Sequence, residues 1–264
     1  MSLRQPREIG IVNWWGVYTL VSKEVRRFFK VGLQTVLAPV VTTLLFLAVF
    51  SLALGRSAQT IGGVSFVEFL APGLVVMAMI QNAFANTSNS VMMAKVQGIV
   101  VDVLMPPLTA GELTFGFVMG GMIRGVVVGI VVALAMAVFV PMHISHPGLI
   151  LFHGIGASLM LSLMGLLTGI VAEKFDQQST VSNFIITPLA FLSGTFYSIE
   201  RLPPEWQGIA LYNPFFYIID GFRYGFIGHS DAPLAHGIAV VVTINVVLWV
   251  TCHYMMFRGY KLKS

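Results

Sequence analysis

The chain has 264 residues, of which 56% are hydrophobic and only 10% are charged, and its mean hydropathy is +0.85. Soluble domains usually carry about a quarter charged residues, so this composition excludes an ordinary soluble protein and indicates a membrane protein. The net charge of +4 is not read as a nucleic-acid interface, because the basic residues follow a membrane topology.

The first predicted element is an amphipathic helix over residues 13–30, lying at the inner membrane surface. Trp14, Tyr18 and Val25 recur at helical spacing, whereas Lys23 and Arg27 fall on a basic face suited to anionic lipid. The alternative is a helix that simply extends the first membrane span into the cytoplasm.

Long uncharged apolar runs then predict six membrane-spanning helices, since a span needs about 20 apolar residues. The longest run holds two spans, because Pro141 and Pro147 interrupt it. The fold class is therefore an all-α membrane protein with one transmembrane domain over residues 1–264. The spans are expected at about 33–54, 69–91, 113–139, 148–171, 180–198 and 235–257.

The basic residues predict the orientation. Six spans put both termini on one side, together with the loops near 92–112 and 172–179, and the positive-inside rule makes that side cytoplasmic. Only Arg56, Arg201 and Arg223 fall on the other side, and Arg124 falls inside span 3. The cytoplasmic set is Arg4, Arg7, Lys23, Arg26, Arg27, Lys30, Lys95, Lys174, Arg258, Lys261 and Lys263.

Span 2 changes from apolar to polar halfway along, in the segment 81–90. Amides and hydroxyls facing lipid would be costly, so they are expected to face another helix, a second subunit or a wet cavity. Hydrogen bonding between helices and a substrate path explain this pattern equally well.

The cytoplasmic loop that follows predicts a short interfacial helix over 94–108, ended by Pro106 and Pro107. Such a helix, held against the membrane, is a surface on which a soluble partner could push. It could equally be a plain connector.

Span 3 carries an intramembrane cation and two rows of glycine. Arg124 lies about 18 Å inward from Glu112 at 1.5 Å per residue, and no carboxylate lies at its depth. It is expected to bind substrate, or to anchor the fold through a cavity or re-entrant backbone carbonyls. The glycines at 116–129 and the small residues of span 4 at 154–169 predict close helix packing, within the subunit or at a dimer seam.

The outer segment 199–231 is too short and too polar for two further spans, which predicts a re-entrant helical hairpin. Its first helix starts at Pro204, Asn213-Pro214 breaks the chain, and Asp220 and Arg223 are spaced to pair. The hairpin is expected to be a structural cap or an exit gate. Its candidate gate residues are Trp206, Asn213, Pro214, Phe216, Asp220 and Arg223.

The sequence lacks the motifs expected for nucleotide binding, hydrolysis or metal binding. No glycine is followed by lysine, which excludes a P-loop, and neither H-E-x-x-H nor G-x-S-x-G occurs. His143, His146 and His153 are read as interfacial residues and not as metal ligands, and His229–Asp231 is read as a loop. Without mid-membrane carboxylates an ion-coupled secondary transporter is a weaker alternative, and an intramembrane enzyme weaker still.

The order of these elements resembles the permease subunit of type-2 ATP-binding-cassette exporters, and within that family the bacterial inner-membrane transport permeases of the YadH type. The resemblance covers essentially the whole chain. It is carried by "VDVLMPPLTAGEL" in the first cytoplasmic loop and by "FLSGTFYSIERLPPEWQGIALYNPFFYIIDGFRYG", with Gly194, Pro203-Pro204, Asn213-Pro214 and Gly221–Arg223 in order.

The resemblance implies that two copies pair in the inner membrane and engage two separate ATPase subunits, which carry ATP and magnesium. No cofactor is implied in this chain, and it is not an enzyme itself. The ATPase contacts would be the amphipathic helix, at Glu24 and Arg27, and the loop 94–108 as a coupling helix. In that loop the candidates are Lys95, Gln97, Asp102, Leu104, Met105 and Pro106.

Related proteins export drugs, glycolipids, polysaccharides or teichoic-acid precursors, and the modest charge of the spans favours a lipid-like or drug-like substrate here. The path is expected between two copies, lined by spans 2 and 5, in contact with membrane lipid. From polarity and helical spacing, its candidate residues are Gln81, Asn82, Asn86, Asn89, Asn183, Thr187, Phe191 and Thr195.

Overall fold

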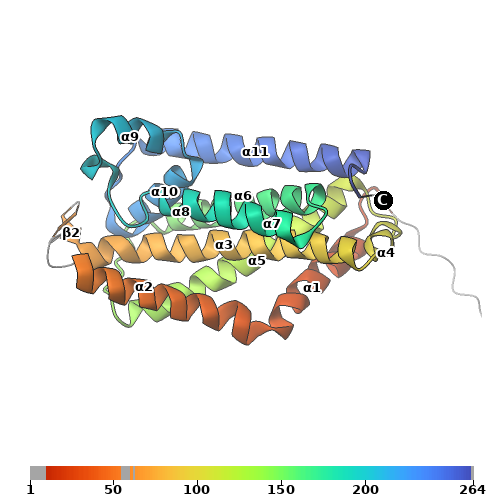
Figure 1. Cartoon of the computed structure of the whole chain (residues 1–264), viewed down its shortest axis with the longest axis horizontal. Helices are drawn as coiled ribbons and strands as arrows, with labels where there is room; N and C mark the ends of the chain where they lie inside the picture. The colour runs from red at the N-terminus through yellow and green to blue at the C-terminus, as the bar shows by residue number, and fades with distance from the viewer. Residues whose placement is uncertain (1–9, 55–59, 62, 263–264) are drawn as a thin grey trace, which may run out of the picture.

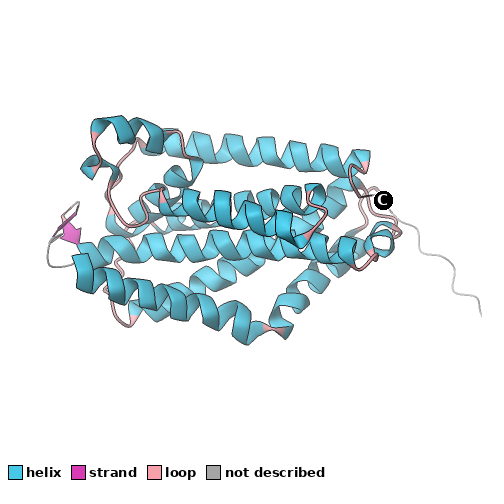
Figure 2. Cartoon of the chain, viewed as in Figure 1, coloured by secondary structure: helices cyan, strands magenta, loops and turns pink. Residues whose placement is uncertain are grey.

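A computed structural model describes residues 10–54, 60–61 and 63–262 as an elongated bundle of helices (Figures 1 and 2). Four basic residues counted in the orientation argument, Arg4, Arg7, Arg56 and Lys263, lie outside the described residues. In chain order the elements are α1 Trp14–Lys30, a π-helical turn Leu33–Leu37, α2 Ala38–Leu54, β1 Thr60–Ile61, β2 Val64–Ser65, α3 Phe66–Val96, α4 Val100–Leu104, α5 Ala110–Ala137, α6 Pro147–Val171, α7 Phe175–Val181, a π-helical turn Ser182–Ile186, α8 Thr187–Phe191, a 3-10 turn Ile199–Arg201, α9 Pro204–Leu211, α10 Pro214–Ile227 and α11 Leu234–Arg258.

Within the described residues, five helices are long and apolar enough to cross a membrane. They are Leu33–Ala53, Phe66–Val96, Ala110–Ala137, Pro147–Val171 and Leu234–Arg258, and they fall at five of the six predicted spans. The only strands in the described chain are the two short ones that pair antiparallel in a hairpin, which the all-α prediction missed.

The remaining predicted span, 180–198, is wrong at its C-terminal end, because the helix ends earlier than expected. Helix runs through α7, the π-turn and α8 but stops at Phe191. Gly194 then has φ +72°, a left-handed conformation that ends helices and that glycine adopts most readily. Asn213 holds this turn, since its amide donates to the Leu189 carbonyl at 3.1 Å and to Ser193 Oγ at 2.9 Å.

Helix α3 is the centre of the bundle. In its most apolar window 83% of the residues are buried, against 11% for the α2 span and 17% for α11. Ser65 caps its N-terminus, because the Ser65 hydroxyl accepts the Glu68 backbone N–H, and the helix packs mainly against α5 and α6. The outer faces of α2 and α11 carry exposed leucines, valines and aromatics that suit lipid.

The small residues of α5 and α6 bring these helices against α3. A Cβ built on Gly121 would lie 2.1 Å from Thr87 Oγ1 and 2.3 Å from Ser162 Oγ, and one on Gly125 would lie 2.8 Å from Ser158 Oγ. Only residues without a side chain allow such a close approach. The prediction that these glycines pack within one subunit is therefore confirmed.

Helix α10 lies inside the bundle, against α6, α3 and α11, and is buried along nearly its whole length. Asn213 caps its N-terminus by accepting the Phe215 N–H, Pro214 follows at the first helical position, and Gly228 ends it with φ +69°. The predicted break at Asn213-Pro214 is confirmed, and so is the short helix that begins at Pro204.

Candidate functional site

Helix α1 is packed against α5 at one end of the bundle, and it meets α2 at an angle (Figure 1). Its bounds match the predicted amphipathic helix, and the bend at Val31 separates it from the first span.

The buried face of α1 holds an unexpected charge. Glu24 is fully buried, 2.9 Å from Arg27 Nη2 and 2.8 Å from Ser90 Oγ of α3. The Glu24 carboxylate therefore anchors α1 to the bundle and is not presented at the surface for a partner.

Two arginines bind consecutive turns of α3. Arg27 of α1 donates to the backbone carbonyl of Asn86 at 2.7 Å and to its side-chain oxygen at 3.2 Å. Arg124 of α5 donates to Asn82 Oδ1 at 2.9 Å. The partner of the intramembrane cation is thus a side-chain amide of α3, which the sequence-based options of a cavity or re-entrant carbonyls did not include.

The eight candidate path residues do not share one environment. Asn82 and Asn86 are buried, and the side-chain oxygen of each accepts a hydrogen bond from an arginine. Thr187 and Thr195 donate to carbonyls of their own segment, while Phe191 stacks on Phe196 with ring centroids 5.1 Å apart. Gln81 is half-buried, and Asn89 and Asn183 are exposed.

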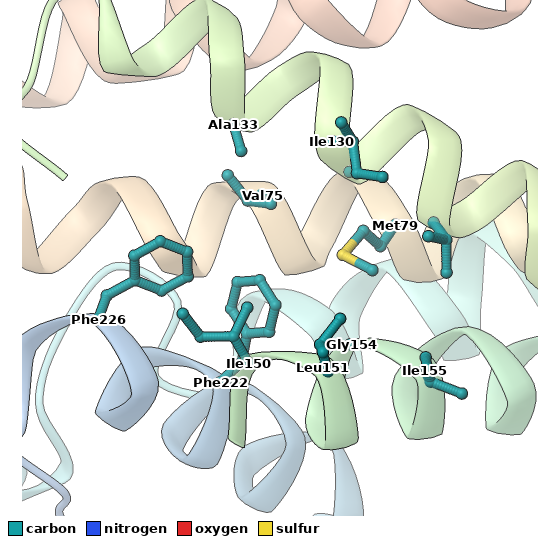
Figure 3. A pocket seen from close by; sticks show the side chains of 12 residues that line it. Val75, Met79, Ile130, Ala133, Ile150, Leu151, Gly154, Ile155, Phe222 and Phe226 are labelled. Carbon is teal, nitrogen blue, oxygen red and sulfur yellow. The ribbon is translucent and has the colours of Figure 1, made fainter. Parts of the chain in front are cut away.

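An apolar cavity of about 130 Å³ lies between α3, α5, α6 and α10 (Figure 3). It is open to the surface, since its lining residues Ile130 and Leu151 are 55% and 64% exposed, and its wholly apolar lining suits a hydrocarbon or aromatic group and not a polar one. The sequence did not predict this pocket, because no sequence motif indicates that glycines such as Gly154 will face a phenylalanine ring on another helix. Its lining is Val75, Met79, Val126, Gly129, Ile130, Ala133, Ile150, Leu151, Gly154, Ile155, Phe222 and Phe226.

A larger groove, of about 510 Å³, lies between α1 and the loop that carries α4. Asn13 ties the two walls together, because its backbone N–H donates to the Glu112 carboxylate and its side chain donates to the Pro107 carbonyl at 3.2 Å. We call this hollow the α1–α4 groove. Its lining is Trp15, Gly16, Thr19, Leu20, Lys23, Ile99, Asp102, Pro106 and Leu108.

The predicted coupling residues of the loop 94–108 have two kinds of environment: some are exposed at or near this groove, and one stabilises the fold. Gln97, Asp102, Met105 and Pro106 are exposed and Leu104 is half-buried, whereas Lys95 caps α6 by donating to three carbonyls at its C-terminal end. The helical part of the loop is shorter than the predicted 94–108, because residues 94–96 continue α3 and α4 covers only Val100–Leu104.

Another contact at the same end involves Lys261, whose Nζ lies 2.8 Å from Glu173 Oε1. The hydrogen bond from Lys261, together with its charge, holds the pKa of Glu173 below its usual value. Both side chains are exposed, so water screens the pair and its contribution to stability is small. It links the C-terminal segment to the end of α6.

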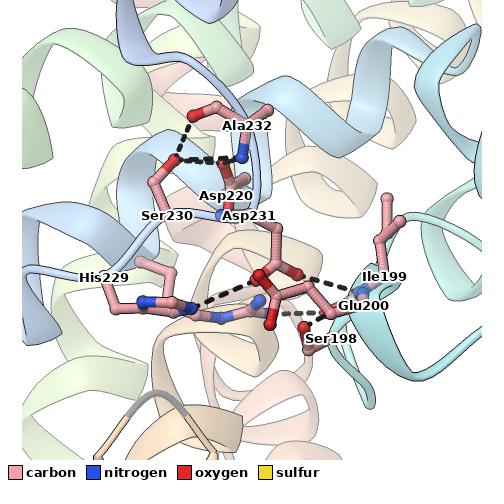
Figure 4. Close-up of polar contacts among 10 residues, drawn as sticks. Ser198, Ile199, Glu200, Asp220, His229, Ser230, Asp231 and Ala232 are labelled. Atoms are coloured by element: carbon pink, nitrogen blue, oxygen red, sulfur yellow. Dashed lines mark hydrogen bonds and ion pairs between the residues drawn. The ribbon is translucent and has the colours of Figure 1, made fainter.

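At the opposite end, the expected ion pair between Asp220 and Arg223 does not form, although both residues are described. Asp220 instead accepts from Ser230 Oγ at 2.6 Å and from the backbone N–H groups of Asp231 and Ala232 (Figure 4). Arg223, 1% exposed, donates to the Gly194 carbonyl and lies 3.7 Å from the centre of the Phe69 ring. Each group has better partners in the tertiary structure than its neighbour one turn away.

The other candidate gate residues differ in exposure. Trp206 is 59% exposed on α9, while Phe216 is 1% exposed on α10.

Labelling of single cysteine variants tests whether α10 is buried and whether α9 faces outward. We expect a membrane-impermeant maleimide added outside intact cells to label Tyr212→Cys, at a position 91% exposed, at least about tenfold faster than Phe216→Cys. Equal labelling would contradict the buried α10, and labelling of neither would contradict the outward orientation.

Comparisons with known proteins identify the family. A family model described as ABC-2 type transporter matches residues 16–227. The inner membrane transport permease YadH of Escherichia coli (strain K12) is 37% identical over 251 residues, covering 95% of this chain and 98% of that protein. Nodulation protein J of Rhizobium leguminosarum bv. viciae is 23% identical over 244 residues, covering 90% of this chain and 91% of that protein.

The chain therefore belongs to the ABC-2 type transporter family. It is a membrane-transport permease, and its apolar helices together with the inner-membrane relative support a place in a bacterial inner membrane. The resemblance inferred from the sequence is thereby confirmed at the level of the family.

Proposed function

We propose that this chain is the membrane-spanning subunit of an ATP-driven exporter that moves an amphipathic, lipid-like or drug-like substrate out of the cytoplasm or the inner leaflet. Two copies pair in the membrane and bind two separate ATPase subunits, which hold ATP and magnesium. The termini face the cytoplasm. Family membership supports this proposal, and so does the lack of a P-loop anywhere in the sequence.

The observation that carries the proposal is the α1–α4 groove. Its walls are the two segments that the family resemblance implies as contacts to an ATPase, and hydrogen bonds from Asn13 hold them together. Movement of an ATPase seated there would pull on α1, and through Glu24 and Arg27 on α3. These hydrogen bonds would carry such a movement from the groove to the central helix of the bundle.

Co-purification with the cognate ATPase tests this proposal. Asp102 is exposed in the groove and Met105 is 76% exposed beside it, so Asp102→Lys and Met105→Asp should reduce the ATPase recovered with the permease by about tenfold or more. Glu205→Lys is the matched control, since Glu205 is an exposed acid on α9 at the other end, and it should leave recovery unchanged.

Two outcomes would contradict the proposal. One is full recovery of the ATPase with both groove variants. The other is transport by the purified chain alone under an ion gradient, which would favour an ion-coupled secondary transporter instead.

A further inference from the structure

Three side chains with metal-binding atoms meet at the end of the molecule opposite α1 and α4. Glu200 comes from the 3-10 turn Ile199–Arg201, while His229 and Asp231 come from the loop between α10 and α11 (Figure 4). One ligand atom from each residue lies within 4.8 Å of the other two. We call these residues the outer cluster.

The ring of His229 points its Nε2 atom toward the Asp231 carboxylate of this cluster. That Nε2 atom is buried from solvent although the side chain is 32% exposed, and it makes no hydrogen bond; it faces Asp231 Oδ1 at 3.4 Å, a contact that is an ion pair only if the imidazole is protonated. A buried polar atom without a partner is costly, and such atoms usually have a bound water or ion. A neutral imidazole with its proton on Nδ1 would present its Nε2 lone pair at this position.

The two carboxylates are also available. Asp231 uses Oδ2 to accept the Ile199 N–H at 2.8 Å, which leaves Oδ1 for a ligand. Glu200 is exposed and forms no ion pair with any described residue. The nearby guanidinium groups have other partners, since Arg201 donates to the Thr60 carbonyl and Arg223 donates to the Gly194 carbonyl.

The surrounding hydrogen bonds hold the cluster in place. Asp220 fixes the loop through its bonds from Ser230, Asp231 and Ala232. The bond from Ile199 to Asp231 then holds the turn that carries Glu200 beside that loop. Partners of this kind set the orientation of metal ligands.

We propose that Glu200, His229 and Asp231 bind a divalent ion of the zinc class. One imidazole and two carboxylates suit zinc, with water in the fourth position, better than magnesium or calcium, which prefer oxygen ligands alone. Zinc binds nitrogen and oxygen at about 2.0–2.2 Å, so its ligands lie within roughly 4.4 Å of one another. The exposed Glu200 side chain can close the remaining gap.

Such an ion would clasp the two ends of the segment that contains α9 and α10. It would therefore restrain the hairpin from outside the bundle. The competing arrangement is a protonated His229 that bridges the two carboxylates with no metal.

Zinc retention by the full-length chain distinguishes the two arrangements. The purified permease, with any affinity tag removed, is stripped with EDTA, incubated with zinc chloride and freed of excess by gel filtration. Mass spectrometry of the metal should find about one zinc ion per chain. Glu200→Gln, His229→Gln and Asp231→Asn should each weaken zinc binding by at least about tenfold in a competition titration with a chromogenic chelator.

Matched variants separate coordination from folding. Glu200→His supplies a better zinc ligand at the same exposed position and should retain the ion, whereas Glu200→Gln should lose it. His143→Gln and Glu205→Gln change exposed residues outside the cluster and should bind zinc as the wild type does. The proposal is overturned if the wild type retains no zinc, or if all three ligand variants bind it as tightly as the wild type.

Discussion

Gly165→Ala is expected to lower the free energy of unfolding by roughly 2–3 kcal/mol, although alanine is the better helix former. A Cβ at Gly165 would lie 2.5 Å from the carbonyl oxygen of Phe84 and 3.2 Å from the backbone nitrogen of Ser88. Both atoms belong to the backbone of α3, so no side chain can rotate away. The two central helices would have to separate, and α3 makes most of its contacts with α6 and α5.

The matched control lies on the same helix. A Cβ on Gly148, in the first turn of α6, meets nothing within 4 Å, so Gly148→Ala should leave stability unchanged or raise it slightly. Thermal unfolding of the detergent-purified variants, followed by circular dichroism, compares them directly. If Gly165→Ala melts at the same temperature as Gly148→Ala, the close contact between α3 and α6 is wrong.

The helices of this fold could be predicted from the sequence because a membrane imposes their length and apolarity. Glycines at four-residue spacing indicated which faces would pack closely, and Gly121 and Gly125 do so. The end of the helix at Phe191 could not be predicted from apolar length or glycine spacing. The segment after it carries no charge, and the turn that follows depends on Gly194, with φ +72°, and on hydrogen bonds from the distant Asn213.

Partners between helices were harder to predict, because the sequence gives the register within one helix but not the rotation and offset between two. Spacing alone allowed Asp220 to pair with Arg223, yet donors from the loop at 230–232 satisfy Asp220. The amides of span 2 left two hypotheses open. The structure engages Asn82 and Asn86 in hydrogen bonds between helices, while the substrate path stays a prediction.

Glu24 carries the second large prediction, because it is the buried charge that attaches α1 to the bundle. Glu24→Gln should keep a hydrogen bond to Ser90 but leave the Arg27 guanidinium without its counter-charge. Breaking a fully buried pair costs about 3–5 kcal/mol. Arg27 is 35% exposed, so water compensates in part and we expect a loss of about 2 kcal/mol in the free energy of unfolding.

A double-mutant cycle isolates this pair from the effects of each single change. Glu24→Gln combined with Arg27→Gln should be less destabilised than the sum of the single variants, with a coupling of about 1 kcal/mol or more. Lys23 also lies within 3.5 Å of Glu24, but its side chain is 49% exposed, so Lys23→Met should cost less than about 1 kcal/mol.

The same variants also test whether Glu24 transmits movement between the ATPase and the central helix. If Glu24 links the α1–α4 groove to α3, Glu24→Gln should reduce substrate-stimulated ATP hydrolysis in the assembled complex by about tenfold or more, while ATPase binding at the groove is retained. The link would be refuted by a coupling energy near zero, or by a Lys23→Met variant as damaging as Glu24→Gln. Loss of ATPase binding together with hydrolysis would instead place Glu24 in support of the groove itself, because α1 would then have left its seat on the bundle.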